Sequence, residues 1–452
     1  MNTKKTDLYG KFEYKGKMYP FFYEDSFVTV IQQPWEYNED FEKESYIEKI
    51  AGVTNSNKVI IFLKCEFLGG KFKQENRNII FSTKGFVLFD KSDDPFDCIE
   101  FESDALNAFY PPIQIMDSKA IIDERTYKIK NSADITKTFV TNVNEENINM
   151  ELTISWRFSH QPENRSMGEK YSVWRMKFES PKYSENIAKY YLYLLDFLKF
   201  VNFRQNITID HFILYKIGKD NPVGIGKFFS HETANDSKAV KSITFEDMAC
   251  DEVSRLFSCI AMQRNQTGYN DSYIPRNTEK FCFFDWTDWL NTAVSFEGEY
   301  SKKYKNQKYQ SDLDFAKAKD YLLGQIALEV EATEQSINNK SNKAWAKFKH
   351  LIEHTDYRLE EKFEFMLQHF SKEISILKNQ FLNRHNVSDE INLADEYAEY
   401  RNKLAHGDVI DINDANAVNF NLMRVFIYCL ILERACITED VRKWIVEKLF
   451  HL

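Results

Sequence analysis

The segment Glu399-Tyr-Arg-Asn-Lys-Leu-Ala-His-Gly-Asp408 closes a predicted helix and decides how the C-terminal part of the chain is interpreted. Apolar residues recur at helical spacing over 389–405, Ser388 is a suitable N-cap, and the two acidic residues after it suit the positive helix N-terminus. Gly407 is a natural stop, because glycine readily adopts the left-handed conformation that ends many helices. We therefore predict a helix over 389–405 with His406 on its last turn or just beyond it.

Helical spacing also extends to both sides of this segment. The further expected helices are 312–334, one long or two shorter helices over 343–382, 413–435, and a last helix that starts at Thr438. Four or five helices in ~140 residues are typical of a small antiparallel bundle. On the penultimate helix we expect Val425, Tyr428, Cys429 and Leu432 to face inward, either in the bundle core or at a dimer interface.

The chain before this helical part shows two other patterns. Segments rich in β-branched and aromatic residues dominate the first 185 residues, and Gly69-Gly70 is expected to be a turn between two strands. Helical and strand-like segments then alternate. The predicted fold class is α+β multidomain, with a β-rich N-terminal lobe over 1–185, a mixed α+β middle lobe over 186–305 and a C-terminal all-α helical bundle over 306–452.

Composition excludes several classes of protein. Hydrophobic residues make up 43% of the 452 residues and aromatic residues 15%, which argues against wholesale disorder. The net charge of −10 excludes a general basic footprint for nucleic acid. The seven cysteines include no C-x-x-C pair, and no signal peptide is visible. No uninterrupted apolar run approaches the ~18 residues that span a bilayer. We expect a cytoplasmic protein with reduced thiols, no membrane partner and no metal site.

Arg401 and His406 are the strongest candidates for catalysis. A histidine can accept the proton of a ribose 2′-hydroxyl or donate one to a leaving oxygen, and a guanidinium can stabilise the charge on phosphate. Five residues on a helix rotate by ~500°, so the two side chains point ~140° apart. Either the chain bends His406 back beyond the helix, or two copies pool their residues. In the alternative interpretation, Arg401 pairs with Glu396 or Asp408, and His406 only caps the helix.

Arg401-Asn402-Lys403-Leu404-Ala405-His406 resembles the R-x4–6-H motif of the HEPN superfamily, in which a polar residue commonly follows the arginine. The bundle is similar to the HEPN fold, and the order of the chain resembles ApeA-type abortive-infection proteins. The close resemblance covers about ten residues, and the helix pattern extends it over ~140 residues.

The resemblance implies a metal-independent endoribonuclease that acts as a homodimer, with no cofactor and with Arg401, His406 and the polar Asn402 as catalytic residues. It implies cleavage of RNA, such as tRNA, to a 2′,3′-cyclic phosphate and a 5′-hydroxyl. In this interpretation the protein is an antiviral effector, and its N-terminal region senses a phage-derived trigger or restrains the nuclease. The competing hypothesis is a non-catalytic HEPN-like scaffold for interaction or nucleotide binding.

The local charge does not favour RNA binding. Residues 388–452 contain 7 Lys and Arg against 12 Asp and Glu, a net charge of 7 − 12 = −5. Because RNA binding needs neutralised phosphates, we expect a locally positive site from Arg401 and Lys403, with or without the lysine run 302–308. That run is otherwise a solvated linker.

Two further segments have weaker claims to function. His350 and His354 have the i, i+4 spacing of zinc ligands, but no third ligand is evident. The aromatic segment 281–289 could stack bases, although we expect it to lie in a buried core.

Overall fold

The structure is a computed structural model, and it describes most of the chain. The described residues are 8–32, 45–73, 76–92, 95–112, 116–121, 124–129, 135–157, 169–209, 211–218, 222–230, 241–267, 270–277, 279–281, 283–304, 313–334, 344–349, 359–408 and 411–451.

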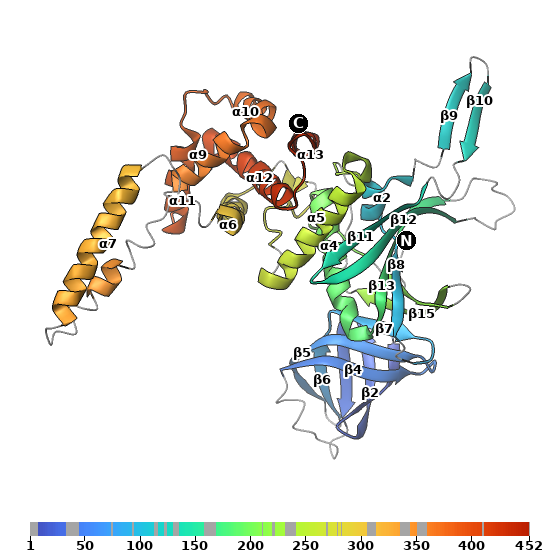
Figure 1. Ribbon diagram of the computed structural model, residues 1–452. Coiled ribbons are helices and arrows are strands. Elements are labelled where there is room, and N and C mark those ends of the chain that lie inside the picture. The colour runs from blue at the N-terminus through green and yellow to red at the C-terminus, as the bar shows by residue number, and fades with distance from the viewer. Residues whose placement is uncertain are drawn as a thin grey trace. The chain divides into compact units, whose positions relative to one another are not determined.

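Strands form the first part of the chain and helices the last part (Figure 1). The strands are β1 (Leu8–Tyr14), β2 (Lys17–Glu24), β3 (Phe27–Gln32), β4 (Tyr46–Thr54), β5 (Val59–Lys73), β6 (Asn76–Ser82), β7 (Gly85–Phe89), β8 (Phe96–Phe101), β9 (Met116–Ile121), β10 (Glu124–Ile129), β11 (Lys137–Val143), β12 (Glu146–Arg157), β13 (Glu169–Lys182), β14 (His211–Ile217) and β15 (Pro222–Ser230). The helices are α2 (Asp104–Phe109), α4 (Ser184–Asn202), α5 (Cys250–Thr267), α6 (Trp286–Tyr304), α7 (Leu313–Glu334), α9 (Leu359–His369), α10 (Ser371–Arg384), α11 (Leu393–Ala405), α12 (Asp414–Arg434) and α13 (Glu439–Phe450).

The chain divides into two compact units. The first comprises Met1–Phe283 with Ala435–Val441, and the second comprises Phe284–Arg434 with Arg442–Leu452. The sequence predicted three parts with boundaries at 185 and 305. The structure groups 186–283 with the preceding strands because β14 and β15 are inserted between β8 and β7 of one sheet.

Six strands of the first unit close into an antiparallel barrel in the order β5-β4-β1-β2-β3-β6, with β6 pairing back to β5. Alternate residues of each strand point inward, and the interior is filled with aromatic rings. Phe62 is completely buried there, with its ring 5.2 Å from that of Phe21 and 5.6 Å from that of Tyr23. The barrel therefore encloses a packed core.

The prediction of a turn at Gly69-Gly70 is wrong. Both glycines lie inside β5, where the pairing with β6 shifts register between Phe67 and Gly69. Gly69 has a φ of +135°, a conformation that favours glycine, so the glycines mark a bulge in a long strand that bends around the barrel.

The remaining strands of the large sheet run β7-β15-β14-β8-β13-β12-β11 and pack against helices α2, α4 and α5. Trp174 on β13 is fully buried, and its ring lies 5.5 Å from Phe197 of α4 and 5.9 Å from Phe257 of α5. The two helices are also joined by Asp196 and Arg264, whose charged atoms are 2.5 Å apart. Burial raises the pKa of Asp196, although the arginine opposes this effect.

The second unit is a helical bundle built around α12. Val425, Tyr428, Cys429 and Leu432 are completely buried, as predicted, and so is nearly every other residue of this helix. In the described part of the chain, α12 alone is long and apolar enough to cross a membrane, and 94% of its apolar window is buried inside the protein. Burial on all sides is typical of the central helix of a bundle.

We predict that Phe62→Ala lowers the stability of the barrel by about 3–5 kcal/mol, because it removes a large ring from a closely packed interior. Native-state hydrogen exchange of the amides in β1–β6 measures this loss directly. Leu68→Ala is the matched control, since Leu68 lies on the same strand but is 56% exposed. Equal effects of the two substitutions would contradict a packed barrel core.

Candidate functional site

Helix α11 carries the predicted catalytic motif and begins at Leu393. The prediction that Ser388 caps this helix is wrong. Asn392 is the N-cap, and its side-chain oxygen accepts a hydrogen bond from the backbone N–H of Ala394 at 3.1 Å. Ser388 instead accepts a hydrogen bond from the backbone N–H of Glu390 in the preceding turn. The helix starts later because Leu393 and Ala394 are the first residues that the bundle buries.

The end of α11 is as predicted, with Gly407 directly after the helix at a φ of +91°. The backbone N–H of Gly407 donates to the carbonyl of Leu404, and that of Asp408 donates to the carbonyl of Lys403, both at 3.1 Å. This pair of bonds is a Schellman motif, which fixes the path of the chain after the last turn. His406 is the C-cap, with an exposed side chain and helical backbone angles of φ −85° and ψ 0°.

Arg401 is held by a carboxylate from another helix. Its Nε donates to Oε1 of Glu297 on α6 at 2.9 Å, and its Nη2 donates to Oε2 of the same carboxylate at 3.3 Å. The Tyr397 hydroxyl donates to Glu297 Oε1 at 3.3 Å. The partners proposed from the sequence, Glu396 and Asp408, are therefore not the main ones. Sequence reasoning missed Glu297 because it lies 104 residues away.

The other two predicted site residues are exposed on α11. Lys403 forms an ion pair with Glu399 one turn earlier, and this hydrogen bond raises the pKa of the lysine. The side chains of Asn402 and His406 are both exposed, so a bound molecule can reach them.

Arg401 and His406 do not meet within one chain. His406 continues the helical path, so the two side chains leave α11 ~140° apart. No hydrogen bond joins them among the described residues. The structure does not bend His406 back toward Arg401, which leaves pooling of residues from two copies as the remaining way to combine them.

The first two lysines of the run 302–308 form ion pairs within the helical unit. Lys302 contacts Glu299 at 2.6 Å and Lys303 contacts Glu433 at 2.5 Å. Both lysines lie on α6 and not in a linker, although both are exposed to solvent. Residues 305–308 lie outside the described residues.

The remaining candidate segments have mixed outcomes. His350 and His354 lie outside the described residues, and in the described part no cluster of three or more His, Cys, Asp or Glu residues could hold a metal. In the aromatic segment 281–289, Trp289 is fully buried as expected, but Phe283 and Trp286 are 75% and 42% exposed.

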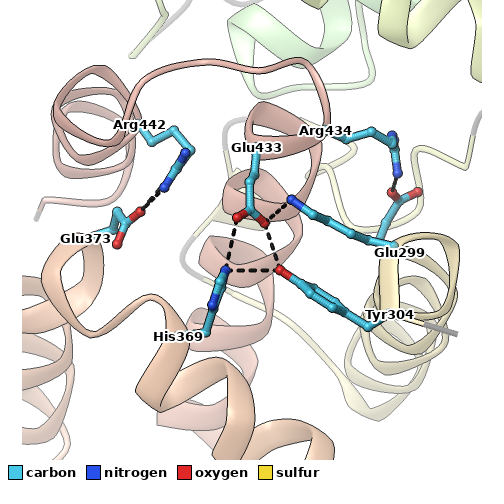
Figure 2. Close-up of polar contacts among 8 residues, drawn as sticks. Glu299, Tyr304, His369, Glu373, Glu433, Arg434 and Arg442 are labelled. Atoms are coloured by element: carbon cyan, nitrogen blue, oxygen red, sulfur yellow. Dashed lines mark hydrogen bonds and ion pairs between the residues drawn. The ribbon is translucent and has the colours of Figure 1, made fainter. Parts of the chain in front are cut away.

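A second group of polar residues joins the ends of α6, α9 and α12 (Figure 2). His369 Nε2 lies 3.0 Å from both Glu433 Oε1 and the Tyr304 hydroxyl, and that hydroxyl donates to Glu433 Oε2 at 2.9 Å. Figure 2 also shows the pairs Glu299–Arg434 and Glu373–Arg442, with separations of 2.6 and 2.7 Å. No local sequence motif marks this group, because its members come from separate helices.

This network shifts the pKa values of its members in opposite directions. Hydrogen bonds from His369, Lys303 and Tyr304 lower the pKa of Glu433 to about 2 against the effect of burial. Burial and the neighbouring Glu433 raise the pKa of Tyr304. The carboxylate stays charged and the phenol stays protonated at neutral pH, so each remains able to keep its hydrogen bonds.

Comparisons of the chain with protein-family models, curated proteins and solved structures found no match.

We predict that Gly407→Ala destabilises the helical unit by about 1 kcal/mol, because alanine is strained at this positive φ. No atom lies within 4 Å of an added Cβ, so the cost is conformational. Gly298→Ala on α6 is the matched control. It also has free space but no positive φ, and we expect it to stabilise the helix by about 1 kcal/mol. Urea denaturation of the two variants should give opposite signs.

We predict that Glu433→Gln destabilises the protein by about 2–3 kcal/mol at pH 7. A folded-state pKa of about 2, below the ordinary value of 4.5, gives stability that is present above pH 4.5 and is lost as the pH falls toward 2. The difference from wild type in urea denaturation should therefore shrink between pH 5 and pH 3. Glu390→Gln, on an exposed turn, is the control. A pH-independent difference would show that the charge of Glu433 is not responsible.

Proposed function

We propose that the chain is a metal-independent endoribonuclease of the HEPN type that acts in antiviral defence. The observation that carries this proposal is the arrangement at the end of α11. An exposed imidazole at His406 follows a helix whose end is fixed by the Schellman motif, and the same helix presents Arg401 with a fixed guanidinium. Rigid placement of an acid–base group and a phosphate ligand is what metal-free RNA cleavage requires.

In the proposed reaction, His406 accepts the proton of a ribose 2′-hydroxyl, and the 2′-oxygen attacks the neighbouring phosphorus. The bond to the 5′-oxygen breaks, and this oxygen takes a proton from water, whose hydroxide the His406 imidazolium then neutralises. The products are a 2′,3′-cyclic phosphate and a 5′-hydroxyl. Arg401 stabilises the negative charge that builds up on the phosphate oxygens, and the exposed Asn402 can donate a hydrogen bond to the same group.

The proposed site is composite. Because Arg401 and His406 leave α11 on different faces, one copy supplies the guanidinium and another copy supplies the imidazole. A two-fold dimer creates two such sites, each with one guanidinium and one imidazole from different copies.

The substrate and the regulation follow from the same proposal. RNA, such as tRNA, would bind at Arg401 and Lys403, although each of these cations already pairs with a carboxylate. Because RNA binding rests on contacts with phosphate, it should weaken as salt rises. The first unit, with its barrel, would sense a phage-derived trigger or restrain the nuclease.

A non-catalytic HEPN-like scaffold is the second candidate function. The ion pair between Arg401 and Glu297 favours it, because a guanidinium that is already neutralised is a weaker ligand for phosphate. The net charge of −5 over 388–452 points in the same direction. Activity measurements on the motif residues distinguish the two candidates.

We predict that the purified protein cleaves RNA in excess EDTA and that Arg401→Ala and His406→Ala each reduce the rate at least ~100-fold. Gel analysis of end-labelled tRNA measures the rate and identifies the product ends. Arg384→Ala and His451→Ala, which alter an arginine and a histidine on the exposed surface, are the controls. Cleavage that is unchanged in both motif variants would rule out this enzyme and favour the scaffold.

Mixing the two inactive variants tests the composite site. After subunit exchange, half of the dimers contain one copy of each variant, and each of these has one complete site of two. We therefore expect the mixture to recover about a quarter of the wild-type activity. If the mixture stays inactive while the copies exchange, Arg401 and His406 act within one chain.

A further inference from the structure

We propose that Glu297 is a positioning residue, which orients the Arg401 guanidinium so that one defined edge of it faces the scissile phosphate. This inference rests on the proposed nuclease function. It concerns a residue of α6 that lies outside the motif of α11.

The geometry of the pair leaves part of the guanidinium free for a second ligand. A guanidinium has five N–H donors, and Glu297 takes one from Nε and one from Nη2 of Arg401. Three donors remain, on Nη1 and the outer side of Nη2. One N–H of Nη1 and the remaining N–H of Nη2 form a second edge that can bind two phosphate oxygens in parallel. The carboxylate therefore fixes the plane of the guanidinium without using its whole binding capacity.

The carboxylate of Glu297 is itself held in place by the hydroxyl of Tyr397. Tyr397 is fully buried, and its ring lies 4.8 Å from Phe363 and 5.9 Å from Phe296. Burial, followed by the charge of Glu297, raises its pKa well above the ordinary value, so the hydroxyl stays protonated and keeps donating to Glu297. A rigid aromatic cluster thus supports a chain of contacts from Tyr397 through Glu297 to Arg401.

The charge of Glu297 has the opposite effect on binding. The carboxylate neutralises a cation that would otherwise attract the RNA backbone from every direction, and it is only 20% exposed. Glu297 therefore weakens the general attraction for RNA while it orients the donor for the reaction. This combination predicts that removal of Glu297 lowers kcat and also lowers KM, so that the reaction is slower while binding is tighter.

Glu297→Gln and Glu297→Ala test the inference when kcat and KM are measured on a defined RNA. We expect kcat to fall at least ~10-fold, because the guanidinium loses its fixed orientation, while KM decreases because the attraction for RNA is stronger. A merely structural defect would lower the fraction of active protein without improving KM. Glu390→Gln, on an exposed turn, is the control. An unchanged or increased kcat in Glu297→Gln would overturn the inference and would indicate that the ion pair restrains Arg401.

A double-mutant cycle separates this inference from the proposed function. In the Arg401→Ala background, Glu297→Gln should have no further effect on kcat, because a positioning residue acts only through the group it positions. If Arg401→Ala alone leaves the activity unchanged, the proposed function fails. If Arg401→Ala lowers kcat but Glu297→Gln lowers it further in that background, the positioning role alone fails.

Tyr397→Phe gives an independent measurement if the Glu297 variants prove too unstable. It removes one hydroxyl and keeps the buried ring, so the fold should persist. We expect kcat to fall ~3-fold or more with KM unchanged, since one hydrogen bond that orients the carboxylate is lost. A wild-type kcat in a folded Tyr397→Phe protein would contradict the proposed chain of contacts.

Discussion

The burial of nearly all of α12 is the constraint on which the helical unit depends. A helix that is apolar on every side must be covered on every side, so α6, α10 and α11 are all held against it. Their faces are thereby fixed, and with them the positions of Glu297 on α6 and Arg401 on α11. An ion pair between residues 104 positions apart in the sequence is a consequence of this packing, and its two hydrogen bonds hold because neither helix can rotate.

The rotation of α11 about its own axis is the second constraint, because it decides which of its polar residues are exposed to solvent. The Schellman motif ends the helix only after His406, and the backbone of His406 still has helical angles. Its side chain therefore leaves the helix in the direction expected for that position, away from Arg401. Packing of Tyr397 and Tyr400 against Trp289 sets which face of α11 is buried. Arg401 lies at the edge of that face and forms an ion pair with Glu297, whereas His406 is exposed.

Features that depend on local residue chemistry could be predicted from the sequence. The strand-rich first part, the bounds of α7 and α12, the inward face at Val425 and the stop at Gly407 follow from periodicity and from the conformational freedom of glycine. Closure of the barrel and the Glu297–Arg401 pair could not be predicted, because both depend on contacts between distant segments. The turn predicted at Gly69 was wrong because glycine occurs in β-bulges as well as in turns, and the sequence alone does not distinguish the two.

The two polar groups of the helical unit differ in a way that bears on function. In the network around Glu433, every charged group drawn in Figure 2 faces an opposite charge or a hydroxyl on a neighbouring helix. The charged groups of this network bind one another and so join the helices, which indicates a structural role. At the end of α11, Asn402 and His406 are exposed, and within the described residues neither side chain is joined to a neighbouring helix. Donors and acceptors that a rigid helix end presents to solvent are available to another molecule. For this reason we place the proposed chemistry at His406 and not at His369, although His369 contacts both Tyr304 and Glu433.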